Sequence, residues 1–152
     1  MEIMDLLATQ PFLAELTAPE YDALGHWANR VVFHPGTRVF NEGGHADRFW
    51  LIREGEVELD TEVPGHGRVV IERLGPGAVL GWSWMFPPYQ WRFGAVARTP
   101  TLAITFDANG IRKLIQADPV LGRKLMSAFA GVVIDRLQHT RARLLDLERA
   151  HA

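Results

Sequence analysis

Glycines recur every few positions between residues 30 and 106 and divide this stretch into short runs rich in β-branched and aromatic residues. Short runs separated by turn residues favour antiparallel β-strands. About eight strands at this spacing predict a jelly roll or barrel. The expected strands are Val31–Phe33, Arg38–Phe40, Phe49–Arg53, Val57–Thr61, Val69–Leu74 and Ala95–Phe106, with Pro100 breaking the last one.

Helix signals lie on either side of these strands. A capping residue followed closely by proline, as in Thr17–Pro19 and Asp118–Pro119, is typical of a helix start. The expected helices are Pro19–Ala28, a second one from a cap at Asp107 through Gln116, and a long one over Pro119–Glu148. The predicted fold is α+β, mainly β: a double-stranded β-helix or jelly-roll barrel with flanking helices. We expect one domain over 1–152, with an N-terminal helical segment (1–29), a β-roll (30–106) and C-terminal helices (107–150).

Apolar residues recur at steps of three or four along the long helix. At 1.5 Å per residue this helix is about 45 Å long, more than a small barrel can cover. The uncovered part of the stripe predicts a homodimer joined through Pro119–Glu148. The alternative is a helix folded back on its own barrel. The stripe consists of Leu121, Leu125, Phe129, Val133, Leu137, Thr140, Leu144 and Leu147.

The charge balance and the lack of cysteine exclude several classes of protein. The formal charge of −2 lacks the basic excess typical of nucleic-acid binders, so we expect no nucleic-acid contact by this chain alone. No signal peptide and no apolar run of about 18 residues is present, so no membrane insertion is expected. Zero cysteines leave no disulfide framework, which fits a cytoplasmic location.

Catalytic and metal-binding patterns are absent from the sequence. The six histidines include no H-x-H pair of the kind that metal-dependent cupins use. Neither Ser83 nor Ser127 lies in a G-x-S-x-G motif. We therefore expect no catalytic residues, no metal and no enzyme activity. The charged side chains of the long helix, Asp135, Arg136, Arg141, Arg143 and Asp146, are expected to form an ordinary solvated face.

Four glycine motifs occur in order along the chain, each with aliphatic or aromatic flanks. They are Phe33-His34-Pro35-Gly36, Val39-Phe40-Asn41-Glu42-Gly43, the run from Phe49 through Gly55 to Val57, and the run from Leu74 through Gly75 and Gly77 to Gly81. Together they resemble the cyclic nucleotide-binding domain family, which includes the sensor half of catabolite activator protein. The resemblance extends from about Ala28 to Leu147.

This resemblance implies a ligand inside the roll, against a short phosphate-binding cassette that is residues 80–95 here. In the family a helix N-terminus and an arginine neutralise the cyclic phosphate, and a glutamate accepts the ribose hydroxyl. Gly81 matches the cassette glycine, Trp82 stands in place of the glutamate, and Arg92 falls roughly where the arginine belongs. Ser83 is expected to cap the cassette helix and to offer its hydroxyl to an anion. The expected ligand-binding residues are Gly81, Trp82, Ser83, Trp84, Arg92 and Phe93.

Aromatic residues crowd the cassette: Trp82, Trp84, Phe86, Tyr89, Trp91 and Phe93. Such rings can stack on a flat ligand, or they can fill the pocket themselves. Three alternatives stay open: a changed ligand specificity, retained binding of cyclic AMP or cyclic GMP, and a ligand-free scaffold with an occluded pocket. The first two make the chain a stand-alone sensor that signals through its C-terminal helix, without the DNA-reading domain that follows the sensor in the activators.

Overall fold

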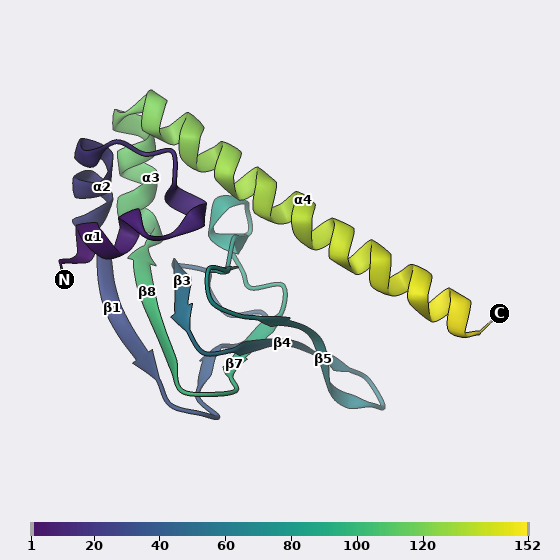
Figure 1. Ribbon diagram of the computed structural model, residues 1–152. Coiled ribbons are helices and arrows are strands. Elements are labelled where there is room, and N and C mark those ends of the chain that lie inside the picture. Colours follow the sequence, from purple (N-terminus) through teal and green to yellow (C-terminus); the bar gives the residue numbers. More distant parts are fainter. Residues whose placement is uncertain (1, 152) are drawn as a thin grey trace.

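Two four-stranded antiparallel sheets face each other in the computed structural model, which describes residues 2–151 (Figure 1). One sheet has the strand order β1-β8-β3-β6 and the other β2-β7-β4-β5. The strands are β1 (Ala28–Phe33), β2 (Arg38–Phe40), β3 (Arg48–Glu54), β4 (Val57–Val63), β5 (Gly67–Leu74), β6 (Val79–Leu80), β7 (Gly94–Ala97) and β8 (Thr101–Asp107). The predicted α+β fold with a β-roll is confirmed.

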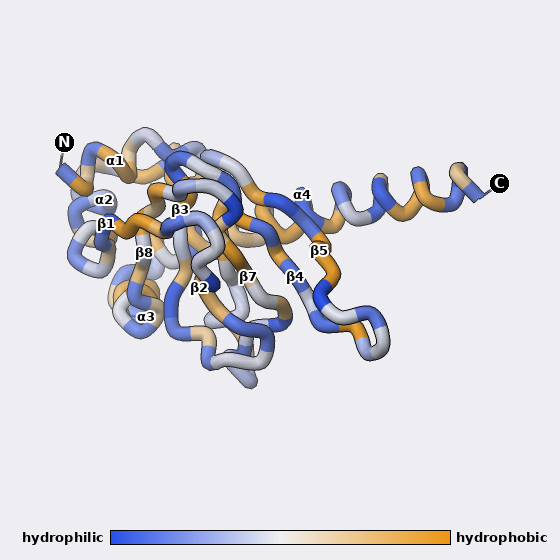
Figure 2. The backbone as a smooth tube through the Cα atoms, turned by 90° about the horizontal axis from the view of Figure 1, so that it is seen from below, coloured by the Kyte–Doolittle hydropathy of each residue, from blue (hydrophilic) through white to orange (hydrophobic). Residues whose placement is uncertain are grey.

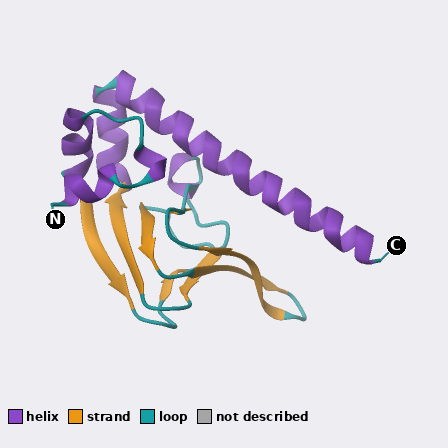
Figure 3. Ribbon diagram, in the orientation of Figure 1, coloured by secondary structure: helices purple, strands orange, loops and turns teal. Residues whose placement is uncertain are grey.

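The shorter helices at the two ends of the β-roll segment gather at one end of the roll, where the long C-terminal helix also starts before it extends past the roll (Figure 3). They are α1 (Ile3–Ala8), the 3-10 helix η1 (Pro11–Leu13), α2 (Ala18–Gly25), α3 (Ala108–Ala117) and α4 (Pro119–Ala150), with a further 3-10 turn η2 (Ser83–Met85) in the cassette. The sequence analysis missed α1 and η1. It also extended α2 to Ala28, which instead begins β1 and pairs with Phe106 of β8. Backbone pairing with a neighbouring strand therefore ends α2 earlier than its local pattern suggests.

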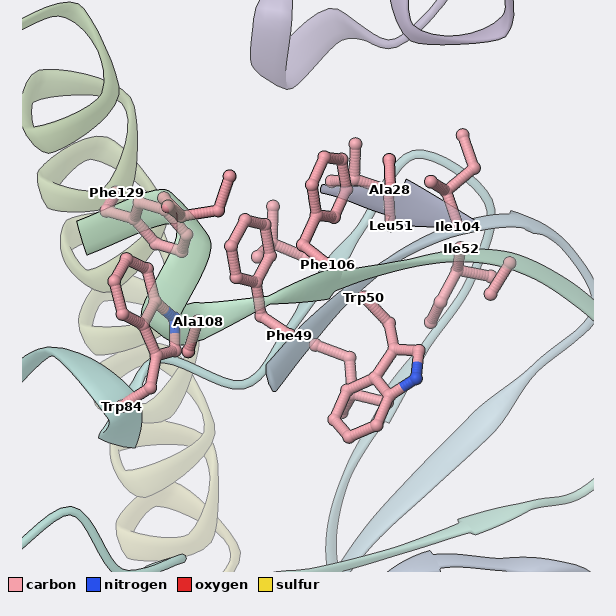
Figure 4. Close-up of a cluster of buried hydrophobic side chains, with 14 of the residues drawn as sticks. Ala28, Phe49, Trp50, Leu51, Ile52, Trp84, Ile104, Phe106, Ala108 and Phe129 are labelled. Atoms are coloured by element: carbon pink, nitrogen blue, oxygen red, sulfur yellow. The ribbon is translucent and has the colours of Figure 1, made fainter. Parts of the chain in front are cut away.

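A column of stacked rings fills the space between the roll and α4. The Phe49 ring stacks on Phe106 with centres 4.5 Å apart and on Trp84 with centres 5.2 Å apart. Phe129 of α4 closes the column edge-on, while Trp50 points away from it toward the space between the two sheets (Figure 4). Burying each such ring stabilises the fold by about 2–3 kcal/mol. The column therefore fixes α4 against both the first sheet and the cassette.

The stripe of α4 divides into a buried and an exposed part. Leu121, Leu125 and Phe129 are fully buried in the domain's own core. From Val133 onward the apolar side chains are exposed, and the helix projects away from the roll with apolar positions interleaved among polar ones (Figure 2). Its first turns are also tied to α2, because Lys124 Nζ lies 2.7 Å from Glu20 Oε1.

Candidate functional site

The cassette runs from the end of β6 to the start of β7. Its first residue after β6, Gly81, has a φ of 93°, and a Cβ there would lie 2.8 Å from the Trp91 ring. Only glycine combines that conformation with such a close approach. The cassette glycine therefore allows Trp91 to pack against the backbone that precedes η2.

The cassette helix is only a three-residue 3-10 turn, Ser83–Met85. Its N-cap is Trp82, which makes no side-chain capping hydrogen bond, so the prediction that Ser83 caps this helix is wrong. Ser83 is itself the first helical residue. Its hydroxyl is buried and has no hydrogen-bond partner within residues 2–151.

The aromatic residues of the cassette do not form one wall. Trp84 is 1% exposed and belongs to the ring column with Phe49 and Phe129. Trp91 is buried and stacks on Phe40 with centres 4.0 Å apart. The remaining rings differ in exposure: Phe93 is buried, Trp82 and Tyr89 are partly buried, and Phe86 is exposed. Part of the crowded aromatic set is therefore core.

Trp82 contacts a side chain that the sequence analysis assigned to a solvated face. The Arg136 Cζ atom of α4 lies 4.4 Å from the centre of the Trp82 ring, a cation–π distance. The same guanidinium donates a hydrogen bond to the carbonyl of Val79 on β6. Trp82 also meets Phe93 edge to face, with ring centres 5.9 Å apart. Trp82 thus lies between the roll and α4.

The environment of Arg136 differs from that of a surface arginine. Burial lowers the pKa of its guanidinium to about 10, although the nearby Glu72 carboxylate raises it in part. The group stays charged at neutral pH. Arg143, two turns farther along, donates to the carbonyl of Ile71 on β5. The prediction of a solvated charged face is therefore wrong for Arg136, while Arg143 stays exposed.

The Arg92 side chain points away from the other predicted site residues. It lies between Trp91 and Phe93, which are both buried, and its own side chain is exposed. Successive side chains of an extended segment point to opposite sides, so two inward rings place the arginine between them outward. Gly81, Trp82, Ser83 and Phe93 cluster at the cassette, while Arg92 faces the outside.

Two hollows lie beside the cassette. A groove of about 750 Å³ runs between η1, the β5–β6 connection and α4, and Arg136 is among its lining residues. A smaller hollow of about 370 Å³ opens between β1, β2 and β3 and has Trp91, Phe40 and Trp50 in its wall. Neither hollow is lined by Trp82 or Arg92.

The comparisons with known proteins settle the family. The model of the family described as "Cyclic nucleotide-binding domain" matches residues 30–118. The chain belongs to the cyclic nucleotide-binding domain family. It is 28% identical over 117 residues to a CRP-like cAMP-activated global transcriptional regulator of Mycobacterium tuberculosis, covering 77% of this chain and 50% of that protein. The domain therefore spans about half the length of this curated relative.

Solved structures of the same family share the fold of this domain. A cyclic nucleotide-binding domain from Methylobacillus flagellatus superimposes with a TM-score of 0.81 at 22% identity, covering 95% of this chain and 82% of that one. The catabolite activator protein of Thermus thermophilus gives a TM-score of 0.70 at 24% identity, covering 91% of this chain and 63% of that one. At these identities the similarity establishes the architecture.

Across residues 2–151, no helix has the length and apolar character needed to cross a membrane. The same residues contain no group of three or more His, Cys, Asp or Glu side chains placed to hold a metal ion.

Proposed function

We propose that this domain is an effector-sensing regulatory module that binds a small flat molecule at the cassette and signals through α4. The contact between Trp82 and Arg136 carries this proposal, because it joins the cassette directly to the long helix. In this proposal, a ligand that binds at the cassette displaces or rearranges this contact. Binding there and the position of α4 are then coupled in free energy.

The effector is proposed to differ from ordinary cyclic AMP. The position of the family's ribose-binding glutamate is occupied by Trp82, which has no acceptor for a hydroxyl. The role is regulatory rather than enzymatic in this proposal, because the matched relative is a transcriptional regulator. We infer a cytoplasmic location on the same basis.

The experiment that tests this function compares two substitutions at one position. Trp82→Glu restores a carboxylate at the cassette, and Trp82→Gln removes the ring without adding charge. Calorimetry with cyclic AMP and cyclic GMP should give binding to Trp82→Glu at least about tenfold tighter than to Trp82→Gln, the effect of one charge-assisted hydrogen bond. Equal affinities for the two variants would contradict a ligand site at this position.

A ligand-free scaffold is the second candidate, and the buried rings of Trp84, Trp91 and Phe93 favour it. In that case the cassette is part of the core, and the exposed part of α4 is the surface that makes contacts with another chain. Val133, Leu137, Thr140, Leu144 and Leu147 follow alternating steps of four and three residues, the spacing of a coiled-coil seam. Both candidates therefore include a homodimer through α4, and they differ in whether any effector binds.

A further inference from the structure

The smaller hollow lies beside two edge strands, because β1 ends one sheet and β2 ends the other. Its volume of about 370 Å³ falls in the range of about 300–1,000 Å³ that small-molecule sites have. Of the described cassette residues 80–95, Trp91 alone lines it. The hollow is therefore separate from the contact between Trp82 and Arg136.

Side chains of both sheets point into this hollow. Thr105 of β8 is paired with Trp50 of β3, so the two side chains share one face of their sheet. Figure 4 shows that Trp50 on this face points toward the space between the sheets. Val31 and Phe33 of β1 are two residues apart and also line the hollow, and Phe40 of β2 lines it from the second sheet. The hollow therefore belongs to the inside of the roll.

Three buried aromatic rings form one wall of the hollow and lie close to parallel. The Phe40 ring makes an angle of 15° with the Trp91 ring and 20° with the Trp50 ring. The backbone holds Trp91 in place, since its amide donates to the Gly44 carbonyl and its carbonyl accepts from the Gly43 amide, both at 2.8 Å. A wall of fixed, nearly parallel rings favours a flat ligand that packs against it in an offset or edge-on arrangement.

The charges around the hollow favour a neutral ligand. Asp47 and Arg48 are the oppositely charged residues that line it, and they form an ion pair with each other at 3.5 Å. Their side chains are 50% and 56% exposed, so this pair lies at the mouth. Apart from the exposed His45, the other lining side chains are uncharged. A charged ligand would lose its hydration in this interior without meeting an unpaired opposite charge, which is costly.

One polar group inside the roll has no partner. Thr105 carries the single hydroxyl among the residues that line the hollow, and its Oγ1 atom is buried without a hydrogen bond to any part of residues 2–151. Buried polar groups are nearly always paired in native proteins. A threonine hydroxyl can donate or accept, so it matches a ligand with one group of either kind.

We propose that the hollow between β1, β2 and β3 is a second small-molecule site, which takes a neutral, flat molecule of one or two rings with one hydrogen-bonding group. The rings of the ligand pack against Phe40, Trp50 and Trp91, and its polar group binds the Thr105 hydroxyl. This site does not depend on the effector proposed for the cassette. The two sites share Trp91, however, because that ring also packs against the backbone of Gly81.

The experiment titrates the full chain with three probes of similar size. Naphthol is flat, neutral and carries one hydroxyl, naphthoate replaces that hydroxyl by a carboxylate, and decahydronaphthol keeps it on a saturated skeleton. NMR follows the indole N–H signals of the five tryptophans, assigned by single Trp→Phe variants. Naphthol should shift the Trp50 and Trp91 signals. Calorimetry should give about tenfold or more weaker binding of naphthoate, and about threefold or more weaker binding of decahydronaphthol.

Variants at Thr105 test the polar contact. Thr105→Val keeps the shape of the side chain and removes the hydroxyl, so naphthol binding should weaken by about threefold to tenfold. Thr105→Ser keeps the hydroxyl and should bind like the wild type. Thr37→Val is the matched control, since Thr37 is exposed and does not line the hollow. Urea denaturation should show no loss of stability in Thr105→Val, because the hydroxyl it removes is unpaired in the free protein.

The tryptophan signals decide where the probe binds. If naphthol shifts Trp82 and Trp84 and leaves Trp50 unchanged, it binds at the cassette, and the second site is overturned. The second site is also overturned if no indole signal moves up to the solubility limit of naphthol. Equal affinities of naphthol and naphthoate would refute the preference for a neutral ligand, and equal affinities of the wild type and Thr105→Val would remove Thr105 from the site.

Discussion

Phe129 of α4 meets Trp84 of the cassette edge to face, with ring centres 5.5 Å apart. The same phenyl ring touches Phe49 of β3 and Phe12 of η1, also edge-on. One side chain of α4 thus contacts three separate parts of the chain. Phe129 is fully buried and belongs to the core of a single copy, so it is not available to a dimer interface.

We expect Phe129→Ala to lower the free energy of unfolding by about 3–5 kcal/mol, because it leaves a cavity at the meeting point of the ring column. Urea denaturation followed by circular dichroism measures the change. Phe86→Ala is the control, since the Phe86 side chain is 59% exposed and should cost less than about 0.5 kcal/mol. Similar losses for the two variants would contradict the position of Phe129 in the core.

Substitutions at Gly81 and Gly77 can be compared to test how closely the Trp91 ring packs against the cassette backbone at Gly81. Both have positive φ, 93° and 86°, but a Cβ at Gly81 meets the Trp91 ring while one at Gly77 meets nothing within 4 Å. Gly77→Ala should cost about 1–2 kcal/mol for the backbone conformation alone. Gly81→Ala should cost clearly more in the same denaturation experiment. If the two losses are equal, Trp91 does not pack there.

The lowered pKa of the Asp60 carboxyl on β4 should make the stability of the fold depend on pH. Burial raises the pKa of the Asp60 carboxyl, but hydrogen bonds from Arg38 and Arg68 lower it by more, so the pKa lies below its ordinary value. A carboxyl with a lowered pKa stabilises the fold above its unfolded pKa of about 3.9 and loses that contribution as the pH falls through the folded value. Stability should therefore fall as the pH drops below about 4.

The variant Asp60→Asn tests this dependence. It should weaken the acid-induced loss of stability and lower the free energy of unfolding at pH 7 by about 1–3 kcal/mol, because two arginines lose their partner. Asp146→Asn is the control, since that carboxylate is 76% exposed and lies 3.8 Å from its nearest arginine nitrogen. Identical pH profiles for the two variants would rule out the role of Asp60.

The exposed stripe of α4 predicts the oligomeric state. Leu137 is 63% exposed in the single chain and lies in the middle of the seam. We expect Leu137→Glu to convert a dimer into a monomer in analytical ultracentrifugation, because a buried charge at a seam position is costly. Gln138→Glu adds the same charge one position away from the seam and should remain dimeric. A wild type that sediments as a monomer would refute the dimer.

Local patterns were sufficient to predict most of the roll and both C-terminal helices. Asp118 and Pro119 lie at the start of α4 as expected, and the Asp118 carboxylate accepts a hydrogen bond from the Leu121 amide. The two-residue strand β6 was missed, since two residues are too few to display an alternating pattern. Helices and strands with a clear pattern in their own residues were therefore predicted. Strand β6, which is defined by its pairing with β3, was not.

The site was less predictable because its central contact joins distant parts of the chain. Nothing local to Arg136 distinguishes it from Arg141 or Arg143, and only the fold brings it over Trp82. The outward position of Arg92 did have a local signal, because it is flanked by two large aromatic residues in a segment leading into a strand. Alternation along that segment predicts that Trp91 and Phe93, rather than Arg92, turn inward.

Because α4 projects beyond the roll, a small tilt of the helix at the cassette would produce a larger displacement at its far end. From Arg136 to Ala150 the axis of α4 runs for about 21 Å, at 1.5 Å per residue. A tilt of about 10° at Arg136 would swing the far end of the helix through about 4 Å, roughly two thirds of the pitch of one helical turn. In the proposed signalling through α4, the exposed leucines near that end would therefore move farther than the part of the helix that packs on the aromatic column.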